Sequence, residues 1–182
     1  MKHFIRHSLL MCFVVLLTGC GTVNINDYKE TTPKLNIENY FEGDTYAWGV
    51  FQDRFGKVRR QFTVDIKGTW DEEAQELKLV EDFLYNDGQT EQRIWVIQKT
   101  GENTYTGMAD GVIGVATGET AGNAFNFKYD FNLPVEGKIW KVSFDDWMYL
   151  NPDEKTLFNK ATIKRFGIRL GDVYIFFRKN KD

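Results

Sequence analysis

The chain has 182 residues, with 23 basic and 26 acidic side chains and a formal net charge of −3 at pH 7. The length suits one domain of ordinary size. No long basic run is present, which argues against a nucleic-acid-binding protein. Aromatic residues make up 15% of the chain, with 16 glycines and 3 prolines. This composition favours a closed antiparallel sheet.

The N-terminal residues have the layout of a cleaved export signal. A basic stretch at residues 2–6 precedes an apolar run at residues 9–17, and Leu17-Thr-Gly-Cys20 follows. The apolar run is too short for a transmembrane helix. The Leu-x-Gly-Cys ending resembles a lipobox, which implies a signal peptide at residues 1–19 and acylation of Cys20. Because Gly21 rather than an aspartate follows, the resemblance further implies transport to the outer membrane of a bacterial cell envelope.

Removal of this signal peptide would exclude several kinds of catalytic site. It would remove both histidines, His3 and His7, together with Cys12, and Ser143 would be the one serine left. Ser-His-Asp and Cys-His catalysis are then excluded, as are zinc sites built from histidine and cysteine. Only carboxylate-rich metal sites remain open. We expect no bound metal and no cofactor. The net charge would become −5, because two basic residues of the signal are lost.

The remaining chain divides into a tether and one domain. Residues 20–35 are mostly polar and are expected to connect the lipid to a domain at residues 36–182. From Tyr40 onward, short aromatic or β-branched segments alternate with turn signals, of which Asn86-Asp-Gly88 is the strongest. The spacing of about ten residues per strand predicts about 8–10 strands. The predicted fold is all-β, a single antiparallel β-barrel with lipocalin-like architecture.

Two segments show the period of two that a half-buried strand requires. Apolar side chains alternate with polar ones over residues 58–70 and again over residues 125–133. The stretch 72–85 is ambiguous, since its apolar residues also fit a helix, although we favour a strand. Glycines 107, 111, 114, 118 and 122 are expected to permit bends, bulges and close approach of strands.

Several charged residues interrupt otherwise apolar faces. A buried charge is costly unless it is paired or hydrated, so these residues pair structurally, line a ligand cavity or act in catalysis. In the sequence Asp145-Asp146-Trp147, strand alternation allows only one of the two aspartates to enter the barrel. The candidate ligand-binding residues are Arg60, Glu81, Arg93, Trp95, Asp110, Tyr129, Asp146 and Trp147.

Most of the chain after residue 20 resembles the DUF3833 family, lipoproteins of unknown function from Gram-negative bacteria. The resemblance implies the fold and the envelope location, but no activity. It is carried by Phe41-x-Gly43, Asp53-Arg54-x-Gly56, Glu81-x-Phe-x-Tyr-x-Asp-Gly88, Arg93-x-Trp95, Ala109-Asp110-Gly111 with Gly114, Gly122-Asn123-Ala124, Asp145-Asp146-Trp147-Met148-Tyr149, and Asn159-Lys160-Ala161 with Phe166-Gly167.

We therefore expect an outer-membrane-anchored lipoprotein, held through acylated Cys20, whose barrel binds a small apolar or amphipathic molecule such as a lipid or fatty-acid derivative. One alternative is a structural envelope protein whose barrel is filled by its own side chains. A third is an enzyme that acts on lipids without histidine, with Glu81, Asp110 or Asp146 as acid or base. A cavity in the barrel would favour the ligand-binding protein over the filled barrel. A strongly raised carboxyl pKa beside that cavity would favour the enzyme.

Overall fold

A computed structural model describes residues 23–179. The expected signal peptide and the acylation site at Cys20 lie outside the described residues. The described elements are a short 3-10 helix, a one-turn α-helix and ten strands: η1 (Ile25–Tyr28), α2 (Ile37–Phe41), β1 (Gly43–Asp53), β2 (Val58–Asp71), β3 (Glu76–Tyr85), β4 (Thr90–Lys99), β5 (Thr104–Ala109), β6 (Val112–Ala121), β7 (Ala124–Val135), β8 (Lys138–Leu150), β9 (Thr156–Arg165) and β10 (Ile168–Lys179).

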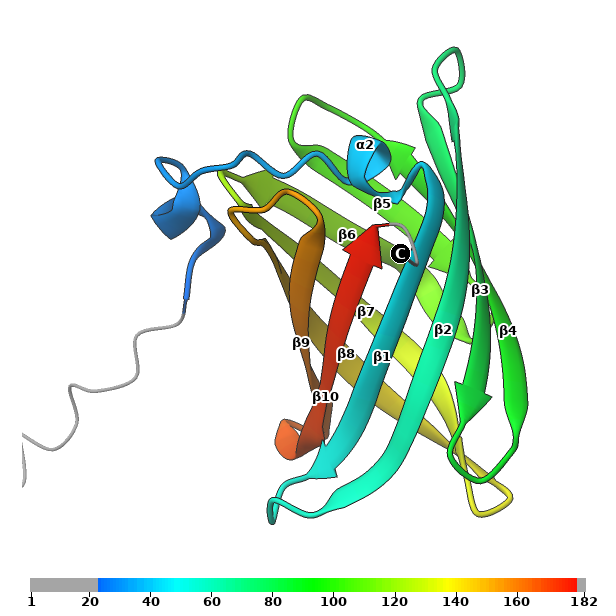
Figure 1. Ribbon diagram of the computed structural model, residues 1–182. Helices are drawn as coiled ribbons and strands as arrows, with labels where there is room; N and C mark the ends of the chain where they lie inside the picture. Colours follow the sequence, from blue (N-terminus) through cyan, green and yellow to red (C-terminus); the bar gives the residue numbers. More distant parts are fainter. Residues whose placement is uncertain (1–22, 180–182) are drawn as a thin grey trace, which may run out of the picture.

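The strands form one closed antiparallel barrel in which neighbours along the chain are neighbours in the sheet (Figure 1). The barrel closes between β1 and β10, where Gly49 lies opposite Ile175. This arrangement confirms the predicted all-β fold and the predicted number of strands. Within the described residues, η1 and α2 are the only helices, and neither is long and apolar enough to cross a membrane.

The alternating patterns predict the two faces of the barrel wall correctly. On β2, Val64, Ile66 and Gly68 are buried while the residues between them are exposed. The ambiguous stretch at residues 72–85 begins with a turn and continues as β3, which pairs with β2 and β4 along its length. Pairing on both edges satisfies the backbone of β3 and overrides the helical spacing of its apolar residues.

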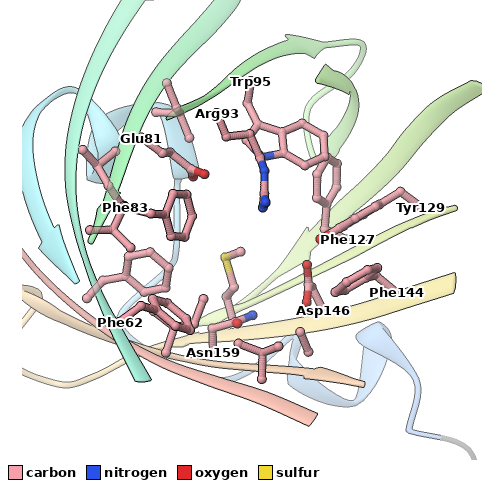
Figure 2. Close-up of a pocket in the computed structure, with 18 of the residues that line it drawn as sticks. Phe62, Glu81, Phe83, Arg93, Trp95, Phe127, Tyr129, Phe144, Asp146 and Asn159 are labelled. Atoms are coloured by element: carbon pink, nitrogen blue, oxygen red, sulfur yellow. The ribbon is translucent and has the colours of Figure 1, made fainter. Parts of the chain in front are cut away.

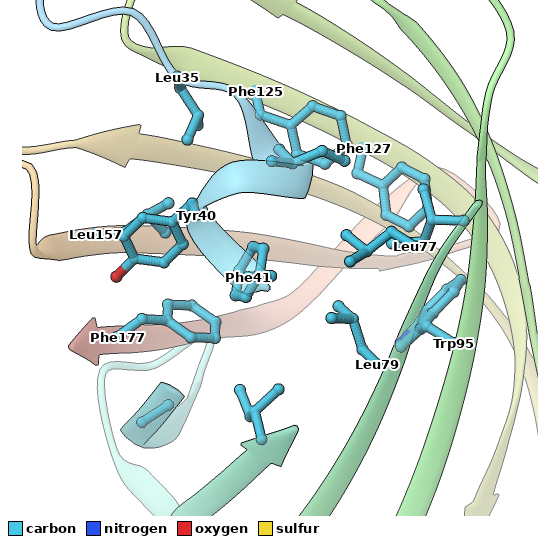
Figure 3. Close-up of a cluster of buried hydrophobic side chains, with 14 of the residues drawn as sticks. Leu35, Tyr40, Phe41, Leu77, Leu79, Trp95, Phe125, Phe127, Leu157 and Phe177 are labelled. Atoms are coloured by element: carbon cyan, nitrogen blue, oxygen red, sulfur yellow. The ribbon is translucent and has the colours of Figure 1, made fainter. Parts of the chain in front are cut away.

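Helix α2 closes one end of the barrel (Figures 1 and 3). Its Ile37 and Phe41 are 1% and 5% exposed and join the main hydrophobic cluster with strand residues such as Leu77, Phe125 and Leu157. A Cβ atom at Gly68 would lie 1.8 Å from the Phe41 carbonyl oxygen, so the helix end needs a glycine there. A second cluster around Phe131, Val142 and Ile163 lies toward the other end.

The glycines of β5 and β6 perform the expected roles. The β6–β7 register shifts between Ile113 and Thr117, and Gly114 between them has a φ of +74°. Gly107 and Gly118 leave room for the aromatic rings of β7, since an added Cβ at either would lie within 2.7 Å of a ring atom. The glycines therefore let β6 bend and let a row of aromatic rings fill the interior.

Residues 25–31 pack against the outside of the barrel, and Leu35 then joins the main hydrophobic cluster. The Tyr28 ring contacts Trp147 and Tyr149 of β8, with centroids 5.8 and 5.3 Å apart. The Thr31 hydroxyl donates to Asn123 Oδ1 at 2.7 Å, and the Leu35 amide donates to the Gly122 carbonyl at 2.7 Å. The described part of the expected tether is thus held on the barrel wall.

Candidate ligand-binding site

A cavity of about 300 Å³ lies inside the barrel (Figure 2). It runs from Ile37 and Phe41 of α2 toward the opposite end, where Arg60 and Tyr85 line it. Most of its wall is aromatic or aliphatic because each strand directs alternate side chains inward. Six of the eight predicted ligand-binding residues line it: Arg60, Glu81, Arg93, Trp95, Tyr129 and Asp146.

Arg93 is the central cation of this cavity. It comes from β4, and Figure 2 shows its guanidinium reaching into the space between the walls. Its Nη2 donates to Glu91 Oε1 at 2.6 Å, and its Cζ lies 5.1 Å from the Phe83 ring centroid. Burial alone would lower the pKa of Arg93, but the negative charges of Glu81 and Glu91 raise it above its ordinary value. The cation is therefore permanent.

Glu81 lies on the neighbouring strand, directly opposite Arg93 in the β3–β4 register. Burial raises the pKa of its carboxyl to about 7; the charge of Arg93 opposes this shift and that of Glu91 adds to it. Glu91 behaves differently. Its burial would also raise its pKa, but Arg93 and the Tyr85 hydroxyl, which donates to it at 2.7 Å, hold that pKa below its ordinary value. At neutral pH, Glu91 is the anion that neutralises Arg93.

A second carboxyl group enters from the opposite wall (Figure 2). Asp146 of β8 is 6% exposed, and its Oδ1 has no hydrogen-bond partner. Burial raises the pKa of Asp146 to about 7, although the Tyr129 hydroxyl, Arg93 and Asn159 all favour its ionised form. Burial and the nearby Asp146 in turn raise the pKa of Tyr129 well above its ordinary value, so its hydroxyl stays protonated. The site thus combines a hydroxyl donor with an acceptor that still has a free lone pair.

Arg60 and Tyr85 lie at the end of the cavity away from α2. The Arg60 guanidinium is 3.4 Å from the Tyr85 ring centroid and donates to Gln89 Oε1 at 2.7 Å. Its side chain is 36% exposed. Burial and the hydrogen bond to Glu91 raise the pKa of Tyr85 to about 12. Arg60 therefore places a second, hydrated cation at this end of the cavity.

Two of the predicted residues do not line the cavity. Asp110 is exposed in the turn between β5 and β6. Trp147 faces outward, where it packs on Tyr28, because it directly follows the inward-facing Asp146 on β8. The same alternation sends Asp145 outward, where Asn126 donates to it at 2.8 Å. The prediction that only one of the two aspartates enters the barrel is confirmed.

Sequence reasoning missed three polar residues of this site: Tyr85, Glu91 and Asn159. Tyr85 lies two residues after Phe83 on β3, and Glu91 lies two residues before Arg93 on β4. Extending the alternating pattern along these two strands would therefore have identified both. Asn159 offers no comparable signal. It is 1% exposed, and its place beside Asp146 depends on the β8–β9 register.

The arrangement can hold an anion and a hydrogen-bonding group within an apolar chamber. A permanent cation lies between two carboxyl groups that titrate near neutrality, and aromatic rings surround all three. Within the described residues, no group of three or more aspartate, glutamate, cysteine or histidine side chains could hold a metal ion.

Comparison with solved structures supports the lipocalin-like architecture. The S-type phycobiliprotein lyase from Guillardia theta is similar with a TM-score of 0.59 and 10% sequence identity, over 81% of this chain and 94% of that chain. At this identity the likeness concerns the fold. Comparison with curated proteins finds no match. The model of a family described as "Protein of unknown function (DUF3833)" matches residues 14–179, which is most of the chain. This protein therefore belongs to the DUF3833 family.

Proposed function

We propose that this protein is an envelope lipoprotein whose barrel captures a single amphipathic molecule with an acyl-type tail and an acidic head group. The head group binds beside Arg93, and the tail lies along the aromatic wall toward α2. The observation that carries this proposal is the position of Arg93, a permanent cation that projects into an otherwise largely apolar cavity.

The cations that line the cavity favour an anionic head group. When Glu81 and Asp146 are protonated, Arg60 and Arg93 are the charged side chains of the lining, and their partners Asp87 and Glu91 lie outside it. A bound carboxylate or phosphate would accept from the Arg93 guanidinium in place of Glu91. It would also disfavour ionisation of Glu81 and Asp146, because like charges in a poorly solvated site repel. Ligand binding and protonation of the two carboxyls therefore support each other.

The rest of the cavity suits an apolar tail. Phe62, Phe83, Trp95 and Phe127 line it on several strands, and Ile37 of α2 closes its far end. Apolar lining with a few convergent polar groups is typical of small-molecule sites, and the volume lies near the lower end of their usual range of roughly 300–1,000 Å³. The tail is thus of moderate length, and one molecule fills the space.

The envelope location is part of the same proposal. Acylation of Cys20 would hold the barrel to a membrane, and the lipobox-like ending followed by Gly21 favours the outer membrane. Thr31 and Leu35 bind Asn123 and Gly122 of the barrel, so the chain that follows the proposed anchor is attached to the barrel wall. Stable anchoring requires more than one acyl chain.

Two alternatives make different predictions. The cavity of about 300 Å³ argues against a barrel filled by its own side chains. An enzyme acting on a bound lipid gains support from Glu81 and Asp146, because carboxyls with a pKa of about 7 suit general acid and base catalysis near neutrality. Turnover of a captured phospholipid or acyl ester that is lost in Glu81→Gln or Asp146→Asn would favour this second function.

Native mass spectrometry of protein purified without detergent tests the binding proposal. We expect the wild type to carry or take up one fatty acid or phospholipid molecule, and Arg93→Leu to lose at least tenfold in occupancy while remaining folded. The matched control is Arg178→Leu, which removes an exposed arginine from the outer face of β10. A wild type that takes up neither lipid, or equal occupancy in both variants, would contradict the proposal.

A further inference from the structure

The four most exposed large hydrophobic side chains of the described residues gather at one end of the barrel. Phe166 and Phe55 are 87% and 80% exposed, and Ile139 and Ile168 are 63% and 59% exposed. They belong to the β9–β10, β1–β2 and β7–β8 hairpins, which lie at the end away from α2 (Figure 1). Strands β2, β1, β10, β9, β8 and β7 are consecutive neighbours, so these hairpins form one continuous stretch of rim.

An arginine accompanies each of the two protruding phenylalanines. The Arg54 guanidinium lies 4.8 Å from the Phe55 ring centroid, and that of Arg165 lies 4.9 Å from the Phe166 centroid. Arg165 also lies 4.3 Å from the ring of Trp140, which packs on the second hydrophobic cluster. Each exposed ring therefore has a cation beside it, and Arg165 connects Phe166 to Trp140 and the second hydrophobic cluster.

Basic side chains outnumber acidic ones on this rim. Residues 53–59, 135–141 and 164–169 together carry eight basic and two acidic side chains. Three of the eight form ion pairs, Arg59 with Asp53, Lys141 with Asp130 and Arg169 with Asp172, and the rim keeps a positive balance. The turns at the α2 end, residues 71–76, 99–104, 121–124 and 150–156, carry seven acidic and two basic side chains. The other two hairpins at this end, which contain Asp87 and Asp110, lie on the remaining side of the barrel. The barrel is thus polarised along its axis, and the exposed rings lie in its positive part.

We propose that this rim, defined by Phe55, Ile139, Phe166 and Ile168, docks on a bilayer that contains anionic lipids. Aromatic and aliphatic side chains at hairpin tips enter the interface between head groups and acyl chains, while arginines beside them pair with phosphates. The end of the cavity that Arg60 and Tyr85 line then faces the bilayer. The idea that the bilayer supplies the ligand rests on the proposed function. The docking of the rim on a bilayer is independent of that function.

A second copy of the chain fits this surface less well than a bilayer does. Rim-to-rim contact would bring together two surfaces of the same positive sign, which costs free energy. The apolar side chains also protrude on separate tips instead of forming one flat patch, whereas a stable protein interface usually buries about 800 Å² on each partner. Separate tips can each enter a fluid bilayer.

Vesicle binding tests the rim directly. All ten strands, both helices and both hydrophobic clusters lie within residues 23–179, so a soluble form beginning at Val23 keeps the complete barrel. We expect it to cosediment with vesicles of phosphatidylethanolamine and phosphatidylglycerol, and more weakly at high salt. The Phe55→Ser/Phe166→Ser variant should lose at least about tenfold in affinity, the scale expected for keeping a phenylalanyl side chain out of apolar surroundings. The matched Leu84→Ser/Met108→Ser variant, which alters exposed residues on β3 and β5, should stay within about twofold.

A fluorophore on the rim provides the second readout. The two cysteines of the chain precede Val23, so a single cysteine introduced by Phe166→Cys takes an environment-sensitive dye selectively. We expect a blue shift on vesicle addition, and none for Glu73→Cys at the acidic end. Absence of wild-type vesicle binding, an unchanged affinity in the double phenylalanine variant, or self-association through the rim without vesicle binding would overturn the proposal. Docking without ligand capture would contradict the proposed function alone.

Discussion

Glu81 and Arg93 lie directly opposite each other on β3 and β4, yet Arg93 forms its ion pair with Glu91 on its own strand. The β3–β4 pairing brings Glu81 beside the Arg93 cation, but Glu91 and not Glu81 forms the ion pair with it. As a result, Glu91 stays ionised while burial raises the pKa of Glu81 to about 7. Asp146 on the opposite wall reaches a similar value. The cavity therefore changes its charge near neutral pH.

This titration predicts a stability that falls as the pH rises. The pKa of Glu81 rises from 4.5 to about 7 on folding, so the folded protein binds more protons than the unfolded chain between these values. The free energy of unfolding should fall by about 3 kcal/mol for this carboxyl between pH 4.5 and 7, at about 1.4 kcal/mol per pKa unit. Asp146 adds a drop of the same sign. Urea unfolding followed by circular dichroism at several pH values measures the slope.

The Glu81→Gln/Asp146→Asn variant is the control for that slope. It retains the size and polarity of both side chains but removes their titration. Its stability should change much less between pH 4.5 and 7 than that of the wild type. Equal slopes in the two proteins would show that other groups cause the pH dependence.

Glu38 fixes helix α2 over the end of the barrel. It is 4% exposed, forms an ion pair with Lys99 and accepts a hydrogen bond of 2.9 Å from the Tyr105 hydroxyl. Replacing it by alanine leaves the Lys99 charge, which is 20% exposed, without its partner. We expect Glu38→Ala to lower the free energy of unfolding by about 3 kcal/mol, as for other mostly buried pairs from which one partner is removed.

A double-mutant cycle separates the ion pair from the packing of α2. Lys99→Met keeps the aliphatic stem of the lysine and removes its charge, so the Glu38→Ala/Lys99→Met variant should recover part of the lost stability. Denaturation midpoints in urea provide the measurement. Strict additivity of the two single changes would mean that the pair is not coupled.

Gly68 is the point where β2 touches the end of α2. Its added Cβ would lie 1.8 Å from the Phe41 carbonyl oxygen, an approach that backbone atoms cannot relieve cheaply. Gly68→Ala should displace α2, lower stability by about 2 kcal/mol or more, and increase the fluorescence of an apolar dye that enters the opened barrel. At Gly101 the nearest atom is the Thr104 hydroxyl, which can rotate away, so Gly101→Ala should show neither effect. A fully stable Gly68→Ala variant with normal dye binding would contradict this account.

Trp147 should influence the N-terminal segment and not the ligand. Its ring contacts Tyr28 outside the barrel, and the cavity lining does not include it. Trp147→Ala should therefore speed trypsin cleavage at Lys29 several-fold while leaving lipid occupancy in native mass spectra unchanged. The comparison variant is Trp95→Ala, which enlarges the cavity wall and should alter occupancy. A loss of ligand from Trp147→Ala equal to that from Trp95→Ala would restore the original expectation for this residue.

Much of the barrel was predictable from the sequence because local patterns determine a strand and its two faces. Alternation over residues 58–70 and 125–133 identifies β2 and β7, and it also places Arg60 and Tyr129 on the inner face. The turn residues at 86–88 mark a hairpin. These features depend on the two-residue period of side chains in a strand and on the φ angles that glycine and asparagine tolerate. Both are properties of a single strand or turn.

Tertiary structure decided what those inward-facing residues meet. Glu91 and Arg93 share one face of β4, but only the β3–β4 register places Glu81 beside the same cation, and neither strand alone contains that information. Alternation already prevents Asp146 and Trp147 from sharing a face, but which of the two faces inward follows only from the way the barrel closes. Helix α2 covers the end of the cavity through contacts with Gly68 and Lys99, which are distant in sequence. Alternation is a local property of the chain, whereas desolvation, ion pairing and cavity shape depend on which strands closure brings together.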